Sequence, residues 1–180
     1  EAQYLTLYDG TPPPTPATPV AATYGVGTNV TFSWNIVTDA EGGISGYRVI
    51  VGTTPGGSNV FNGTITTTNK PASGTYGQTL YARVAAINNA GIESSFSAVT
   101  TGTILLDPSA DSDGDGMNNA SEVVAATNPL DANSVLRIVS LSPGKLLTWA
   151  SVSGQTYQVY FATNLLTGFV PLSGVVTAAA

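Results

Sequence analysis

The stretch NVTFSWNIVTDAEGGISGYRVIVGTT (residues 29–54) decides the fold of the N-terminal half of the chain. It holds two short runs rich in Val, Ile, Thr, Tyr and Phe, separated by Gly and polar turn residues. Such runs favour strands, because β-branched and aromatic side chains fit a pleated, half-buried surface. Three further runs of the same kind follow at residues 59–68, 78–88 and 95–104. Short strands at this spacing predict a β-sandwich over residues 20–106.

Particular residues within these runs resemble those of the fibronectin type III family. Trp34 lies in the second predicted strand, and Tyr47 begins the third. The run Tyr81-x-x-Val84-Ala85 and the turn after it, residues 88–91, are similar to the sixth strand and the following turn of that family. The resemblance implies an immunoglobulin-like sandwich. Its aromatic residues are expected in the core rather than in a sugar-binding surface.

The chain carries few charges and lacks the residues that most enzymes use. Its 180 residues include 5 Lys or Arg, 11 Asp or Glu, no His and no Cys, and 9% are charged, against about 25% in an average domain. So few basic residues argue against binding to nucleic acid or to an anionic membrane surface. The absence of His and Cys removes the usual general base and the thiol nucleophile. We therefore expect no catalytic site and no enzyme activity, and the short apolar runs predict no membrane insertion.

The negative charge is concentrated in one segment. The formal net charge is −6, and six of the 11 acidic residues lie within residues 107–131. The other 155 residues hold five acidic and five basic residues, so their charges cancel. The acidity therefore marks one local site and is not a general property of the surface.

Residues 111–122, DSDGDGMNNASE, match the twelve-residue calcium loop D-x-[DN]-x-[DN]-G-x5-E at every defined position. Alternate acidic side chains of such a loop converge on one point, and Gly116 permits the sharp turn. Oxygen ligands without His or Cys favour Ca2+ over zinc or iron. The predicted ligands are Asp111, Asp113, Asp115, Met117 through its carbonyl, Asn119, Glu122 and Asp131. The alternative is a solvated acidic loop that holds no metal.

The surroundings of this loop resemble a thrombospondin type 3 calcium repeat and, less closely, half of a dockerin. Residues 119–127 predict one short helix that Pro129 ends, and nothing before Asp111 has a helical pattern. A dockerin would require a second loop and helix. The thrombospondin-type family often has Asp where this chain has Asn128. The resemblance implies a calcium-binding junction over residues 107–134.

The C-terminal segment, residues 135–180, repeats part of the first module. TFSW (31–34) and GYRVIVGT (46–53) align with LLTW (146–149) and TYQVYFAT (156–163). The segment has no counterpart of the later Tyr-bearing strand of the first module. It therefore predicts a second fibronectin-like sandwich that is incomplete.

The first ten residues predict a strand, and residues 11–19 predict a proline-rich linker. The linker sequence TPPPTPATP favours an extended polyproline II spacer of up to about 28 Å. The strand QYLTLY (3–8) resembles LYARVA (80–85), the strand that the second sandwich lacks. An incomplete sandwich exposes an apolar groove that a strand from elsewhere can fill. The predicted strand-donation residues are Tyr4, Leu5, Leu7 and Tyr8.

These features predict a structural subunit of an extracellular filament or cell-surface fibre. Donation of the N-terminal strand to a neighbouring copy is a head-to-tail contact that does not close, so it propagates into a homopolymer. Calcium is expected to rigidify the junction between the two sandwiches.

Other interpretations stay open. In one alternative, the N-terminal strand pairs within its own chain and forms no polymer. In another, the sequence is one part of a longer multidomain protein. A different class of function is a non-catalytic spacer or adhesion region of a larger secreted bacterial protein, such as a polysaccharide-degrading enzyme, with a glycan or cell-surface partner. A first residue of Glu1 rather than Met fits a processed, exported product.

Overall fold

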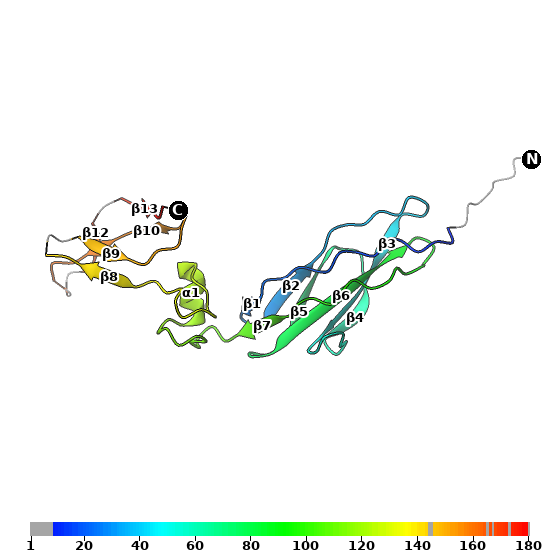
Figure 1. Cartoon of the computed structure of the whole chain (residues 1–180), viewed down its shortest axis with the longest axis horizontal. Coiled ribbons are helices and arrows are strands. Elements are labelled where there is room, and N and C mark those ends of the chain that lie inside the picture. Colours follow the sequence, from blue (N-terminus) through cyan, green and yellow to red (C-terminus); the bar gives the residue numbers. More distant parts are fainter. Residues whose placement is uncertain (1–8, 144–145, 165, 167, 173, 180) are drawn as a thin grey trace, which may run out of the picture. The chain divides into compact units, whose positions relative to one another are not determined.

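The computed structural model describes residues 9–143, 146–164, 166, 168–172 and 174–179. The chain divides into two compact units, Glu1–Asp107 and Pro108–Ala180 (Figure 1). The architecture is all-β apart from one short helix, as the sequence predicts. No helix in the described part of the chain combines the length and apolar character needed to cross a membrane. The predicted strand-donation residues Tyr4, Leu5, Leu7 and Tyr8 lie outside the described residues.

The first unit is a sandwich of two sheets (Figure 1). Its five-stranded sheet has the order β1-β7-β6-β3-β4, and a second sheet pairs β2 with β5. The strands are β1 (Tyr24–Val26), β2 (Asn29–Ser33), β3 (Ile44–Gly52), β4 (Phe61–Ile65), β5 (Asn69–Ser73), β6 (Thr79–Asn88) and β7 (Thr103–Leu106). All of these pairs are antiparallel except β1 with β7. The pairing confirms the predicted sandwich for the first half of the chain.

The core of this unit lies between the two sheets. β3 pairs with β6 along nearly its whole length, with Val49 opposite Val84. Side chains of a strand alternate between its faces, and these two inward-facing residues are fully buried with Phe32 of β2. Trp34 and Tyr47 are 6% and 3% exposed, and their rings meet edge to face with centroids 5.6 Å apart. Both aromatic residues therefore belong to the core and not to a sugar-binding surface.

The segment after β6 pairs with that strand through hydroxyl side chains. In each of three pairs, the backbone N–H of a Ser or Thr donates to a β6 carbonyl, and its hydroxyl oxygen accepts from the N–H of the same β6 residue. The pairs are Ser94 with Ala86, Ser97 with Val84 and Thr100 with Ala82. The hydroxyl residues are three positions apart, whereas their partners on β6 are two positions apart. The segment therefore does not pair residue by residue, as a regular strand does. The strand predicted over residues 95–104 is therefore wrong for most of its length, and only β7 forms a regular strand there.

The proline-rich segment is packed on the first unit and is not a free spacer. Pro13, Pro16 and Pro19 are buried, whereas the residues between them are exposed. A period of three matches the three residues per turn of a polyproline II helix. At the end of the segment Val20 exchanges two backbone hydrogen bonds with Ser33 of β2, at 2.7 and 3.0 Å. The burial pattern agrees with the predicted polyproline II conformation, but the segment packs against the first unit. Its role as a linker to the N-terminal strand stays a prediction.

A buried amide holds the N-terminal end of this segment. Asn88, the last residue of β6, is fully buried. Its Nδ2 donates to Asp9 Oδ2 at 2.7 Å and to the Thr11 carbonyl at 3.0 Å, and its Oδ1 accepts from the N–H of Ile92 at 2.8 Å. The described chain therefore enters the first unit at the Asn88 end of β6. It leaves at the other end, because β7 pairs with β6 at Thr79.

The described residues of the second unit form one helix and six strands of two to four residues. The elements are α1 (Asn119–Ala125), β8 (Ile138–Leu141), β9 (Leu147–Trp149), β10 (Thr156–Tyr157), β11 (Tyr160–Phe161), β12 (Val170–Pro171) and β13 (Val176–Thr177). Antiparallel ladders join β8 to β9, β10 to β13 and β11 to β12. None of the described side chains on these strands is buried. Apolar residues that are more than half exposed include Ile138, Val139, Leu141, Tyr160 and Val170.

Replacing Asn88 by Ala tests the contact that holds the proline-rich segment. The Asn88→Ala variant leaves the carboxylate of Asp9 and the N–H of Ile92 without this partner, so we expect a loss of about 2 kcal/mol in the unfolding free energy of the first unit. Urea unfolding followed by Trp34 fluorescence measures the loss in a Trp149→Phe background, since the chain has two Trp residues. Asn62→Ala, at an exposed position of edge strand β4, is the matched control. Equal stability of the two variants would contradict the role of Asn88.

Candidate metal centre

The acidic loop folds around the carboxylate of Asp111. Its Oδ1 accepts from the N–H of Gly114 at 2.7 Å, and its Oδ2 accepts from the N–H of Gly116 at 2.9 Å. Both glycines have positive φ, 80° and 97°, a conformation that only Gly adopts without strain. Hydrogen bonds from these amides, that of Gly116 above all, lower the pKa of Asp111 below its usual value of 3.8. Asp111 is therefore ionised at neutral pH and fixes the turn of the loop.

Asp113 and Asp115 each use one carboxylate oxygen within the loop and leave the other without a partner. Asp113 Oδ1 accepts from the N–H of Asp115 at 3.2 Å, and Asp115 Oδ1 accepts from the N–H of Met117 at 2.7 Å. The Oδ2 atoms of both residues are buried and have no hydrogen-bond partner. Carboxylate oxygens of Asp111, Asp113 and Asp115 all lie within 4.8 Å of one another. The loop thus gathers three negative charges at one point and neutralises none of them.

Helix α1 carries a fourth carboxylate, that of Glu122, which lies outside the group of three close aspartates but is influenced by their charges. Asn118 caps the helix, because its Oδ1 accepts from the N–H of Ser121 at 2.8 Å. Ala126 ends it in a left-handed conformation with φ 58°, and Glu122, one turn inside the helix, is fully buried. Glu122 Oε2 is buried without a partner, while Oε1 accepts from the Thr127 hydroxyl at 3.5 Å. The helix therefore presents a buried carboxylate oxygen that has no hydrogen-bond partner.

The electrostatics of Glu122 connect it to the loop. Burial is the main cause that raises its pKa above the usual 4.5, and the charges of Asp113, Asp115 and Asp111 raise it further. Like charges act on a carboxyl in this way only over short distances. A cation among the four carboxylates removes both costs, because it neutralises the repulsion and coordinates the orphaned oxygens. The residues present fit a hard cation with oxygen ligands, of which Ca2+ is the one that takes most protein ligands.

The remaining predicted ligands have other contacts in the structure. Asn119 is fully buried, and its Oδ1 accepts from the N–H of Ser112 at 3.3 Å, so the side chain ties the helix start to the loop. Asp131 Oδ1 accepts from the N–H and the Nδ2 of Asn133 at 3.1 and 3.2 Å. Asp131 lies outside the group of three close aspartates. A ligand role stays a prediction for Met117, Asn119 and Asp131, as it does for Asp111, Asp113, Asp115 and Glu122.

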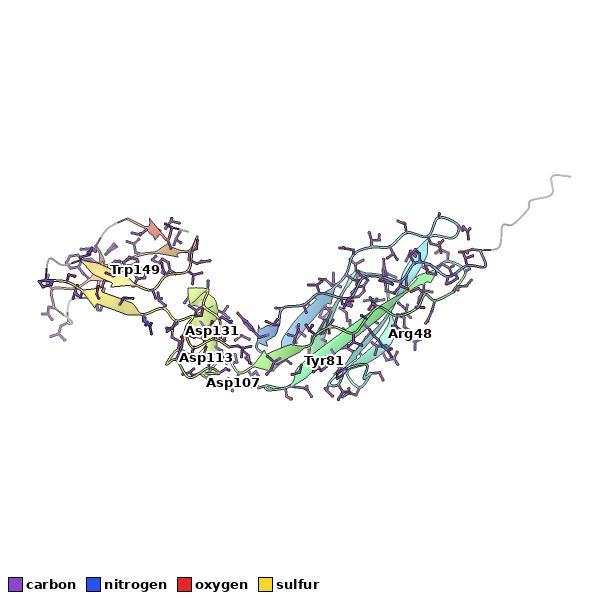
Figure 2. The ribbon with its side chains drawn as sticks, viewed as in Figure 1. Arg48, Tyr81, Asp107, Asp113, Asp131 and Trp149 are labelled. Atoms are coloured by element: carbon purple, nitrogen blue, oxygen red, sulfur yellow. The ribbon has the colours of Figure 1, made fainter. Side chains whose placement is uncertain are left out.

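Two supporting residues were missed in the sequence. Thr127 donates through its hydroxyl to both the backbone carbonyl and Oε1 of Glu122, and Asn118 caps α1. An Asn directly before the first helical residue, as at Asn118, is a signal for a helix start that the sequence does contain. No sequence pattern marks Thr127, because its hydrogen bonds to Glu122 depend on how the chain turns after the helix. In Figure 2 Asp113 lies in the loop beside α1.

The fold and the site together define a class of protein: a β-sandwich protein with an acidic loop that suits a hard cation. Among solved structures, the chain is similar to the sixth fibronectin type III domain of human fibronectin type III domain containing protein 3, with 19% identity, a TM-score of 0.45, and coverage of 59% of this chain and 97% of that one. It is similar to a Fn3-like protein from Clostridium thermocellum with 29% identity, a TM-score of 0.39, and coverage of 54% and 96%.

A third similar structure is an alpha-L-rhamnosidase from Dictyoglumus thermophilum. The identity is 18% and the TM-score is 0.42, and the alignment covers 52% of this chain and 12% of that one. Comparison with protein-family models and with curated proteins returned no match.

Calcium addition tests the site through the stability of the second unit. A ligand that binds only the folded state stabilises it by about 2.7 kcal/mol at 100 times its Kd, so Ca2+ should raise the melting temperature and a chelator should lower it. Trp149 fluorescence in a Trp34→Phe background reports this unit. The Asp113→Asn, Asp115→Asn variant should show no calcium response. Glu93→Gln, a remote exposed acid 3.6 Å from Arg48, is the control that should respond fully.

The pH dependence without calcium tests the burial of Glu122. The pKa of Glu122 is higher in the folded state than in the unfolded state, so ionisation of this carboxyl destabilises the fold. Without calcium, the free energy of unfolding should therefore fall as the pH rises above about 4.5, the usual pKa of Glu. Asp111, with its lowered pKa, changes stability only at a pH below its usual 3.8. Glu122→Gln should raise the melting temperature in chelator at pH 7 and remove the calcium response. A variant that melts lower than the parent in chelator would show that the ionised carboxyl is not penalised.

Proposed function

We propose that this chain is a non-catalytic structural protein of the cell exterior in which one Ca2+ fixes the start of the second unit. The observation that carries the proposal is the set of three buried carboxylate oxygens without partners, on Asp113, Asp115 and Glu122. A cation at this point links the loop to α1. It therefore stabilises the segment through which the first unit is joined to the strands of the second.

The ligand atoms of this site suit extracellular Ca2+. The ligand atoms are carboxylate oxygens, and extracellular modules bind Ca2+ with Kd values of roughly 10⁻⁴ to 10⁻³ M. Magnesium prefers fewer protein ligands and keeps more of its waters. A structural ion needs no reactive partner, which agrees with a chain that contains neither His nor Cys.

The same proposal includes assembly of the chain into a filament. The described strands of the second unit form short ladders, and most of their apolar side chains are exposed. An exposed apolar face of this kind marks an interaction surface in a stable protein. In this proposal the N-terminal strand, with Tyr4, Leu5, Leu7 and Tyr8, fills the incomplete sandwich of a neighbouring copy. The contact is head-to-tail and propagates.

A second candidate function is a non-catalytic spacer or adhesion region of a larger secreted protein, for example one that degrades polysaccharides. The observation that favours it is the course of the chain through the first unit. The chain enters beside Asn88 and leaves beside Thr79, at opposite ends of the ten-residue strand β6. Modules with their two ends far apart suit a linear array. A glycan or cell-surface partner belongs to this alternative.

Removal of residues 1–8 separates the two candidates. The deletion keeps Asp9 and its bond to Asn88, so the first unit should unfold at the same urea concentration as in the parent chain. We expect polymers of the intact chain with Ca2+, seen by light scattering and electron microscopy, and monomers of the deleted chain. Removal of residues 1 and 2 alone, which leaves the predicted strand intact, is the control and should still allow polymers to form. An intact chain that remains monomeric at high concentration would contradict filament assembly and favour the spacer.

A further inference from the structure

The second unit repeats the central contact of the first in atomic detail. Trp149 and Tyr157 meet edge to face with ring centroids 6.0 Å apart, as Trp34 and Tyr47 do at 5.6 Å. In both units the Tyr hydroxyl accepts from the backbone N–H of the third residue after the Trp, at 2.8 Å in the second unit and 3.4 Å in the first. Both indole Nε1 atoms are buried without a partner. This agreement makes Tyr157 the counterpart of Tyr47, and residues 156–161 the counterpart of β3.

One edge of residues 156–161 is paired along its length. Phe161 pairs with Val170 on β12, and Tyr157 pairs with Val176 on β13. The carbonyls of Gln155 and Val159 accept from Ala178 and Leu172. Residues 155, 157, 159 and 161 are separated by even numbers, so β12 and β13 pair with the same edge, although their registers differ by two residues. Together they take the place of β4, which pairs with β3 in the first unit.

The other edge is the one that β6 covers in the first unit. Hydrogen-bonded and non-hydrogen-bonded residues alternate along an antiparallel strand. Since Val159 bonds toward β12, the backbone groups of Tyr160 point to the opposite edge, and so do those of Thr156. Within residues 9–143 and the described residues after them, no strand pairs with that edge. Tyr160 is 54% exposed and Phe161 is 40% exposed, whereas their counterparts Ile50 and Val51 are buried.

We infer that residues 3–8 of a second copy pair antiparallel with residues 156–161 at this edge, in the position that β6 holds in the first unit. The inference rests on the proposed filament and names its acceptor. The sequence QYLTLY aligns with LYARVA (80–85), so Leu5 and Leu7 take the places of the buried Ala82 and Val84. The partner of Arg83 is Ile50, whose counterpart is Tyr160. The register therefore places Thr6 of one copy opposite Tyr160 of the other.

The course of the chain through the first unit favours a second copy as the acceptor. Residues 1–8 start from Asp9, which is bound at the Asn88 end of β6. The chain continues toward the second unit from β7, which pairs with β6 at Thr79. These two ends of β6 are nine residue steps, or about 30 Å, apart, and residues 1–8 span at most about 29 Å when fully extended.

Disulfide trapping between two single-cysteine copies tests the register. The chain has no Cys, so introduced thiols have no native competitor. A Thr6→Cys copy mixed with a Tyr160→Cys copy in Ca2+ under mild oxidation should give a product of twice the 18.3 kDa chain mass on a non-reducing gel. Thr6→Cys mixed with Phe161→Cys should give little of this product, because Phe161 is one residue out of register and its side chain lies on the other face of the strand. Asn62→Cys on edge strand β4 of the first unit controls for random contacts between edges.

A second pair guards against an effect of losing the Tyr160 ring. The same register places Tyr4 opposite Ala162, because Tyr81 pairs with Gly52 in the first unit. Tyr4→Cys with Ala162→Cys should therefore also be trapped. If polymers form but neither disulfide-linked dimer is trapped, the assigned edge is wrong and the filament proposal is unaffected. Monomers without either product would overturn both. A Thr6→Cys, Tyr160→Cys chain that closes within one monomer would show that the strand acts within its own chain.

Discussion

Repulsion among four carboxylates is the constraint on which the second unit depends. Asp111, Asp113, Asp115 and Glu122 fall within twelve residues, and the fold brings the first three within 4.8 Å of one another while it buries the fourth. Backbone amides of the loop satisfy one oxygen of Asp113 and one of Asp115. They cannot neutralise the charge. In the proposed function, a hard cation coordinates the remaining oxygens, removes the repulsion and connects the loop to the helix.

The two units are stabilised in different ways. The first has a buried apolar core between two sheets, and even its proline-rich edge contributes three buried side chains. The second repeats the Trp–Tyr contact of the first, but the strand that corresponds to β3 is paired on one side only among the described residues. A fold with an open apolar edge is stable in water only when something covers it. In this account the ion orders the start of the unit, and a strand from a second copy completes its sheet.

How much could be predicted from the sequence depends on whether a feature is local. The cluster of Asp111, Asp113 and Asp115 and the helix after it were predictable, because the spacing that brings these carboxylates together lies within twelve residues. The strands around Trp34 and Tyr47 were predictable from β-branched runs for the same reason. The pairing of Ser94, Ser97 and Thr100 with β6 was not, because hydroxyls three residues apart gain meaning only beside a strand. The packing of Pro13, Pro16 and Pro19 on the sandwich likewise depends on distant residues.

Amide hydrogen exchange of the full chain, with and without Ca2+, tests the central claim most directly. The account predicts that calcium slows exchange at the amides of Gly114, Gly116, Met117 and Ser121, whose hydrogen bonds build the loop and cap α1. Amides of β3 and β6 should exchange at the same rate in both conditions, since their ladder does not involve the ion. Equal exchange of the loop amides with and without Ca2+, at concentrations up to several millimolar, would contradict the account.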